Sequence, residues 1–185
     1  MPLIYITGVS GTGKSTIMQV LRARGYEAHG VDEEKYADWV NRATGKLDAF
    51  PRRNKRIDLH RWYEKHHEVL DARNISQLQR SAKTQHKLIF LCGSARGERK
   101  LWHYFDVTIV LLADARTLKH RIAKRSNSVF GKTSQELAGI LRWRARNNAR
   151  YYCRLGAATV GATKPVDKVV DDILAIVQAR TTRSA

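Results

Sequence analysis

The stretch Gly8-Val9-Ser10-Gly11-Thr12-Gly13-Lys14-Ser15 decides the fold of this chain of 185 residues. It follows the phosphate-loop pattern of a glycine, four free positions and then Gly-Lys-Ser. Because Gly13 has no side chain, the backbone can approach a phosphate there, and successive N–H groups form an anion-binding nest. Lys14 can reach the β- and γ-phosphates, and the Ser15 hydroxyl can bind Mg²⁺. The pattern therefore predicts a nucleoside triphosphate site made by Gly8, Ser10, Gly11, Thr12, Gly13, Lys14, Ser15 and Thr16.

The residues on either side of this loop support the same interpretation. Residues 3–7 form a short apolar run that is typical of a buried strand. After the loop, Ile17, Val20 and Leu21 recur at helical spacing, and Gly25 stands where a helix C-cap glycine belongs. A strand, a glycine loop and a helix thus follow in the order that a phosphate loop requires. An ordinary glycine-rich turn has no such requirement, so this order favours the phosphate loop.

Length and composition indicate one folded domain. A chain of 185 residues with 43% hydrophobic content can bury a sizeable core as a single unit. No run of about 18 apolar residues is present, so we expect no membrane span. The sequence enters its first strand at once, which leaves no room for a signal peptide and predicts a cytoplasmic protein. Neither Cys92 nor Cys153 has metal-ligand spacing, and Cys92 lies in an apolar run where a core residue is expected.

The net charge of +17 has two interpretations. It can serve a polyanionic partner such as nucleic acid. It can also serve an enzyme that handles two phosphorylated molecules, with the remaining cations on a solvated surface. The basic residues are spread along the chain without a basic tail. The expected partners are therefore ATP and a small acceptor, with nucleic acid left open and a monomer or homodimer as the assembly.

Further apolar runs predict the rest of the sheet. Strands are expected over 26–32, 87–93, 107–113 and 157–160, and helices alternate with them. Asp114 is expected to cap a helix, and Thr133 with Glu136 forms a capping box for another that ends at Gly156. The chain is predicted to be an α/β protein, a three-layer doubly wound parallel sheet of about five strands.

Residues 36–86 separate the second and third expected strands and are predicted to be a helical insertion. Residues 35–50 contain helix-like residues and a turn around 44–46. A basic loop at 51–56 follows. Apolar residues over 59–70 recur at three and four, which indicates an amphipathic helix capped by Asp58, with a break near Asn74 and a continuation over 75–83.

Nearly the whole chain resembles the small P-loop phosphotransferases of shikimate kinase, gluconate kinase and nucleoside or nucleotide kinase type. The residues 6–16 are similar to the opening of these enzymes. The resemblance implies transfer of a phosphoryl group from ATP, with Mg²⁺, to a hydroxyl. It also implies that Asp32 contacts the metal or takes the acceptor proton, with Glu33 as second candidate. Alternatively, Asp32-Glu33-Glu34 caps a helix. By the same resemblance the loop 161–165, with Thr163 and Pro165, packs beside adenine.

Arginines are the expected cations of a lid over about 121–142. Arg121 and Arg125 lie one helical turn apart, just before a polar loop, so both can point the same way. In the resembling kinases, lid arginines close over the phosphates and exclude water. Arg142 lies on the far side of this lid, and Gly131 is expected to allow it to move.

The acceptor side is expected at the end of the third strand and in the insertion. Arg96 could hold a carboxylate or phosphate bidentately, and Gly93 would keep its approach open. Trp62 is an acceptor candidate, as are the neighbouring aromatic residues, although aromatic residues at helical spacing are more often part of a core. The basic loop could steer an anionic acceptor or be solvated. Further candidates are Trp39, Tyr63, His66 and His67 in the insertion, and Arg52, Arg53, Lys55 and Arg56 in the basic loop.

The acceptor motifs of the nucleoside monophosphate kinases and the double-aspartate and triple-glycine signatures of shikimate kinase are not in the sequence. A nucleoside, a sugar-like metabolite and an antibiotic therefore stay open as acceptors. Two other functions stay open as well: a polynucleotide 5′-hydroxyl kinase or RNA-binding NTPase, and a nucleotide-dependent regulatory ATPase.

Overall fold

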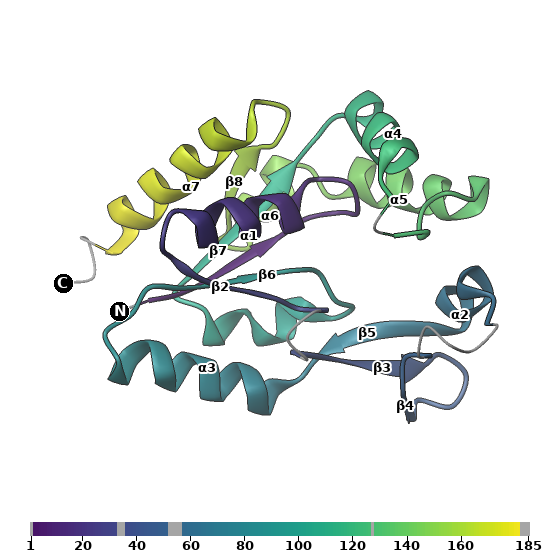
Figure 1. Ribbon diagram of the computed structural model, residues 1–185, viewed down its shortest axis with the longest axis horizontal. Helices are drawn as coiled ribbons and strands as arrows, with labels where there is room; N and C mark the ends of the chain where they lie inside the picture. The colour runs from purple at the N-terminus through teal and green to yellow at the C-terminus, as the bar shows by residue number, and fades with distance from the viewer. Residues whose placement is uncertain (1, 33–35, 52–56, 127, 182–185) are drawn as a thin grey trace.

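The computed structural model describes residues 2–32, 36–51, 57–126 and 128–181 (Figure 1). Its main sheet has the strand order β2-β6-β1-β7-β8, and every neighbouring pair is parallel. This confirms the predicted doubly wound α/β sheet. The strands are β1 (Leu3–Thr7), β2 (Glu27–Gly30), β6 (Ile89–Cys92), β7 (Val107–Leu112) and β8 (Ala158–Gly161).

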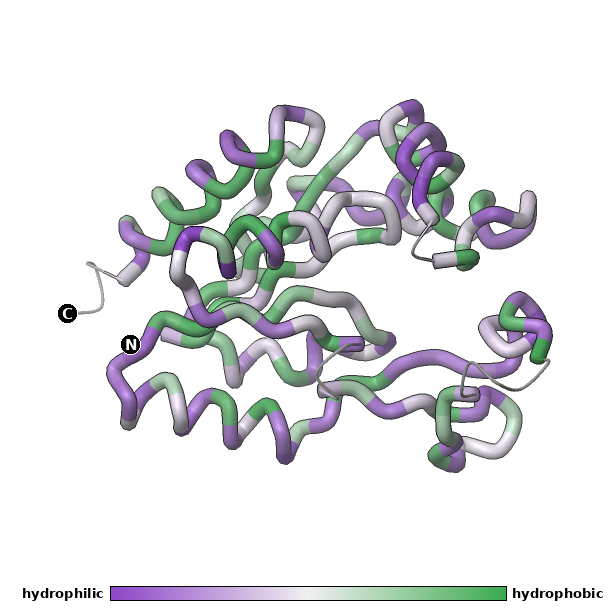
Figure 2. The backbone as a smooth tube through the Cα atoms, viewed as in Figure 1, coloured by the Kyte–Doolittle hydropathy of each residue, from purple (hydrophilic) through white to green (hydrophobic). Residues whose placement is uncertain are grey.

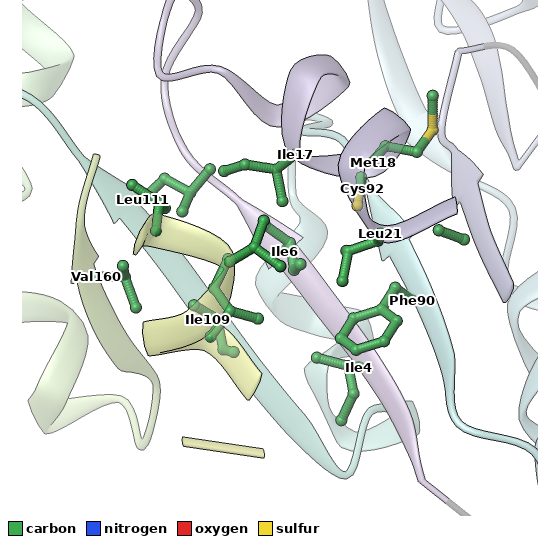
Figure 3. Packing of buried hydrophobic residues seen from close by; sticks show 14 of the residues in the cluster. Ile4, Ile6, Ile17, Met18, Leu21, Phe90, Cys92, Ile109, Leu111 and Val160 are labelled. Atoms are coloured by element: carbon green, nitrogen blue, oxygen red, sulfur yellow. The ribbon is translucent and has the colours of Figure 1, made fainter. Parts of the chain in front are cut away.

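Both faces of the sheet are covered: β1 is buried at every position, and its side chains alternate between the faces. Ile4 and Ile6 pack against α1 (Lys14–Ala23) and α7 (Val166–Thr181). Figure 3 shows this layer, with Ile17, Met18 and Leu21 of α1 over the strands. On the other face, Leu3 and Tyr5 pack with α3 (Ala72–Thr84) and the 3₁₀ segment η1 (Glu98–Tyr104).

The helices after β7 begin as the capping residues predict. Asp114 accepts a hydrogen bond from the backbone N–H of Thr117 at the start of α4 (Ala115–Lys124). The capping box of Thr133 and Glu136 opens α5 (Ser134–Arg146). The single helix expected to continue to Gly156 is instead two helices, because Asn148 caps a new one, α6 (Ala149–Arg154).

The insertion is not helical throughout, and this prediction was wrong. Its helix α2 (Leu59–Lys65) begins at the predicted cap Asp58 but ends at His66, where the backbone becomes extended. The chain then forms β5 (His66–Leu70), which pairs antiparallel with β3 (Ala37–Asn41). The short β4 (Leu47–Asp48) adds the third strand of this second sheet.

Strand pairing explains why helical spacing misled at 66–70. The backbone of β5 bonds along the whole of β3, and a short segment takes the structure that its tertiary partners favour. The turn at 44–46 is confirmed, with Gly45 in a left-handed conformation. Asp71 rather than a break near Asn74 begins α3, since its carboxylate accepts from the backbone N–H groups of Arg73 and Asn74.

Hydrophobic and hydrophilic residues alternate along the outer helices, while the central strands are mainly hydrophobic (Figure 2). Cys92 is buried in this core, as the sequence predicts, and Cys153 is exposed. In the described part of the chain, every helix is too short or too polar to cross a lipid bilayer.

Candidate active site

A cleft of about 1710 Å³ opens at the carboxyl ends of β1 and β6, where ligands bind in doubly wound sheets. The phosphate loop forms its floor. The insertion contributes β5 to one wall, and α4 with α5 contributes to the other (Figure 1). The two walls also touch: His60 Nδ1 lies 3.0 Å from a Glu136 carboxylate oxygen, and the Tyr63 and Phe130 rings pack edge to face.

The phosphate loop has the tight shape that its glycines allow. A Cβ atom at Gly8 would lie 2.7 Å from the carbonyl oxygen of Leu111, so no larger residue fits there. Gly13 has a φ of 98° and stands as N-cap of α1. The first turn of α1, from Lys14 to Thr16, lines the cleft with the positive end of the helix.

The Lys14 ammonium lies inside the loop. Its Nζ donates hydrogen bonds to the carbonyl oxygens of Gly8 at 2.7 Å and Val9 at 3.3 Å. Burial lowers the pKa of Lys14, and the nearby carboxylates Asp32 and Glu98 act in the opposite direction. A cation that is partly desolvated in this way interacts strongly with an incoming phosphate.

Asp32 follows β2 and lines the same cleft as the loop. Its charge is the largest of those that favour the charged form of Lys14. The backbone N–H of Val31 donates to the Cys92 carbonyl at 3.0 Å, which fixes where the strand ends. The second candidate, Glu33, and its neighbour Glu34 lie outside the described residues. The next described element is the strand β3, so a helix that Asp32 would cap is not found among those residues.

Glu68 is a carboxylate of this site that sequence reasoning missed. Burial, together with the charge of Asp32, raises the pKa of Glu68 to about 8, and the charge of Lys14 acts in the opposite direction. Its side chain therefore lies near the phosphate loop, although it comes from β5. The residues 66–70 were interpreted as helix, and only their pairing with β3 brings Glu68 into the cleft.

Glu98 is a second missed carboxylate. It accepts hydrogen bonds from the Tyr5 hydroxyl at 2.8 Å, the Thr7 hydroxyl at 2.9 Å and the backbone N–H of Ala95 at 2.9 Å. Burial raises its pKa. It ties the end of β1 to the loop after β6. The available signal was an acidic residue just beyond the carboxyl end of a parallel strand.

Both predicted lid arginines point toward the phosphate loop. One Nη of Arg121 donates to the Thr12 carbonyl at 3.3 Å. Arg125 donates to the Ser10 hydroxyl at 3.0 Å and to the carbonyl of Phe130, and burial lowers its pKa. The structure thus brings both guanidinium groups to the phosphate loop, whereas Arg142 is exposed on α5 and does not line the cleft.

The predicted hinge Gly131 has a packing reason of its own. It has a φ of 89°, and a Cβ atom there would lie 2.9 Å from the Ile140 side chain.

The structure divides the acceptor-side candidates. Arg96 and Gly93 line the cleft, but a Cβ atom at Gly93 would lie 2.2 Å from Val31, so packing between strands explains this glycine. Trp62 stacks on His66 with ring centroids 3.7 Å apart and does not line the cleft. Trp39 and Tyr63 do line it. The basic residues 52–56 lie outside the described residues.

The expected adenine side lies after β8. Ala162 and Lys164 line the cleft, while Thr163 and Pro165 are exposed beside them and do not. Within the described residues, His, Cys, Asp and Glu side chains nowhere form a group of three that could hold a metal. This arrangement suits Mg²⁺ carried on a triphosphate, which needs only one or two protein ligands and keeps water on its other positions. Ser15 and Asp32 are oxygen donors of the right kind.

Comparison with known proteins places the chain in a family. Residues 4–142 match the family described as an AAA domain. No curated protein is significantly similar in sequence.

Several solved structures share the fold. The gluconokinase from Sinorhizobium meliloti 1021 aligns with a TM-score of 0.54 and 16% identity over 99% of this chain and 95% of its own. Shikimate kinase from Acinetobacter baumannii in complex with shikimate aligns with a TM-score of 0.57 and 16% identity, over 97% of this chain and 94% of its own. Deoxyadenosine kinase from M. mycoides with bound dATP aligns with a TM-score of 0.52 and 17% identity, over 96% of this chain and 100% of its own. The matched family covers most of the chain and the fold agrees along its length: the chain belongs to the AAA domain family and has the fold of the P-loop kinases.

Proposed function

We propose that this chain is an ATP-dependent phosphotransferase that moves the γ-phosphoryl group to a hydroxyl of a small molecule. One observation carries the proposal: Lys14 and the lid arginines Arg121 and Arg125 gather at the phosphate loop, and Asp32 lines the same cleft, where its charge acts on Lys14. Phosphoryl transfer needs cations around the spreading charge and a group that takes the proton of the attacking hydroxyl.

In the proposed reaction the acceptor oxygen attacks the γ-phosphorus and forms a new P–O bond. The bond between the γ-phosphorus and the bridging oxygen breaks, and ADP leaves with the electron pair. The hydroxyl proton passes to the Asp32 carboxylate. Lys14, Arg121 and Arg125 stabilise the negative charge on the phosphoryl oxygens.

Mg²⁺ fits this site, with Ser15 and Asp32 as its protein ligands. When bound, the ion neutralises phosphate charge and aligns the triphosphate. Asp32 has two oxygens, so it can serve as a ligand and still accept a proton. The alternative base, Glu33, remains a prediction.

The remaining assignments follow the shape of the cleft. The chain works as one domain, in which residues 36–86 bind the acceptor and residues 121–142 act as lid. Arg96 and Trp39 contact the acceptor. The loop with Thr163 and Pro165 lies beside the adenine.

A nucleic-acid acceptor is the second candidate, and one observation favours it. Among the described residues, the cleft is lined by eight lysine and arginine side chains but three carboxylates, with several aromatic rings between them. Basic grooves with aromatic rings are typical of single-strand binding sites. The volume of 1710 Å³ also exceeds the range of about 300–1,000 Å³ that is usual for one small ligand.

The test is ATP consumption by the purified protein against nucleosides, sugar acids, aminoglycosides and RNA oligonucleotides with free 5′-hydroxyls, with mass spectrometry of the products. A phosphorylated small molecule is the expected result. Phosphorylation of RNA alone would move the assignment to the second candidate. ATP hydrolysis that no acceptor changes would contradict both and favour a regulatory ATPase.

A further inference from the structure

A second group of polar side chains gathers at strand β5, next to Glu68. Arg42 Nε donates to the carbonyl oxygen of His66 at 3.0 Å. The backbone N–H of Arg96 donates to the carbonyl oxygen of Glu68 at 2.7 Å. Two arginines that are far apart in the sequence are therefore attached to the same strand two residues apart, with His67 between them. We call Arg42, His67 and Arg96 the β5 cationic cluster.

The members of this cluster act on one another electrostatically. Burial lowers the pKa of Arg42, and so does the charge of Arg96. Burial also lowers the pKa of His67, with further lowering by Arg96, Arg42 and His66. In contrast, the charges that act on Glu68 are those of Asp32 and Lys14. Neighbouring residues of β5 thus belong to two different environments, one at the phosphate loop and one at the cluster.

The cluster has no counter-charge among the described residues. Neither Arg42 nor Arg96 forms an ion pair with a carboxylate there. His67 Nδ1 is buried and, within the same part of the chain, has no hydrogen-bond partner. All three side chains line the cleft. Like charges held together beside an unused donor or acceptor are unfavourable unless an anion joins them.

We propose that Arg42, His67 and Arg96 bind an oxyanion of the acceptor, a phosphate or a carboxylate separate from the hydroxyl that receives the phosphoryl group. The assignment of this anion to an acceptor rests on the proposed function. Guanidinium groups hold such anions bidentately. A bound anion also offsets the two arginine charges, so the protonated form of His67 becomes more favourable and can donate through Nδ1.

The experiment follows the His67 ring by NMR in the protein saturated with Mg²⁺ and a non-hydrolysable ATP analogue, so that the phosphate loop is occupied. Inorganic phosphate is titrated in one arm and malonate in another. We expect the anion to raise the pKa of His67 by about one unit. Tighter binding of phosphate would indicate a phosphorylated acceptor, and tighter binding of malonate a carboxylate.

Variants connect the signal to the cluster. Arg42→Gln and Arg96→Gln should each weaken binding of the probe about tenfold, the loss expected for one charged hydrogen bond. Arg73→Gln removes the same charge from an exposed position on α3, outside the cleft. This variant should bind the probe as the parent protein does.

Two results would overturn the proposal. One is that phosphate and malonate do not shift the His67 resonance. The anion concentrations in this measurement are those that saturate the phosphate loop when the ATP analogue is absent. The other is equal binding by both cluster variants and the parent. Because this readout needs no turnover, it is independent of the acceptor screen. If the cluster binds an anion but the screen yields no phosphorylated product, the anion site is supported and the proposed reaction is contradicted.

Discussion

The two sides of the cleft are built in different ways. The nucleotide side comes from consecutive residues, where Gly8 to Ser15 form a loop and the start of a helix. The acceptor side is assembled from β3, β5 and the loop after β6. Strand pairing joins β3 to β5, and a backbone hydrogen bond from Arg96 to Glu68 attaches the loop. The phosphate loop is a local motif that specifies a phosphate site by itself. A wall assembled from several segments can bind a different ligand when single residues in it are replaced. Substitutions on each side of the cleft test whether the two walls act as separate sites.

Lys14→Ala should have the largest effect, because among the described residues Lys14 alone places a cation inside the loop. We expect a loss of phosphoryl transfer of about 10³-fold or more, with an unchanged circular dichroism spectrum and melting temperature. Lys119→Ala, on the exposed side of α4, is the matched control and should keep full activity. Retained turnover in Lys14→Ala would remove the phosphate loop from the reaction.

Arg125→Ala tests whether the lid belongs to the nucleotide side. Its guanidinium contacts Ser10 of the loop, so its loss should lower kcat by about 10²–10³-fold. Arg116→Ala on the same helix is exposed outside the cleft and should behave as the parent does. If Arg125→Ala changes only the KM of the acceptor, the lid arginine serves the other wall.

Asp32→Asn probes the boundary between the two sides. Loss of the proton acceptor should lower kcat by about 10²-fold while the affinity for ATP without Mg²⁺, measured by calorimetry, changes little. A rate equal to that of the parent would show that Asp32 neither takes the proton nor holds the metal.

Trp39→Ala addresses the assembled wall alone. The ring lines the cleft opposite the phosphate loop, and a lost stacking contact should raise the acceptor KM about tenfold without changing the KM for ATP. Leu47→Ala on neighbouring β4 changes an exposed side chain that does not line the cleft, and serves as control. Equal changes in both KM values would mean that the walls are not separate sites.

Glu68→Gln should give the smallest effect, one of stability. The folded-state pKa of about 8 lies above the ordinary value of 4.5, so the folded protein keeps a proton that the unfolded chain releases. Stability is therefore lost as pH rises from 4.5 to 8. The neutral glutamine should raise the melting temperature by about 2–4 °C at pH 8.5 and leave it unchanged at pH 4.5. Equal shifts at both pH values would rule out this titration.

The same contrast explains where sequence reasoning succeeded. The strands within 3–7 and 107–113 could be predicted because they are apolar runs of the right length. The helix starts at Asp58, Asp114 and Thr133 could be predicted because these side chains cap the helices through local hydrogen bonds. It failed at residues 66–70. There the aromatic and apolar spacing of α2 runs on into β5, and nothing local marks the change from helix to strand.

The sequence by itself determined the phosphate loop, the parallel sheet and the arginine pair at Arg121 and Arg125, because glycine conformation, hydrophobic periodicity and helical spacing act between near neighbours. Only the tertiary structure decided that Glu68 and Glu98 enter the cleft and that Arg42 and Arg96 meet on β5. These contacts join residues far apart in the sequence. Glu68 reaches the cleft because β5 pairs with β3, where a slip of one position would turn its side chain to the opposite face, and Arg96 is attached to β5 by a backbone hydrogen bond.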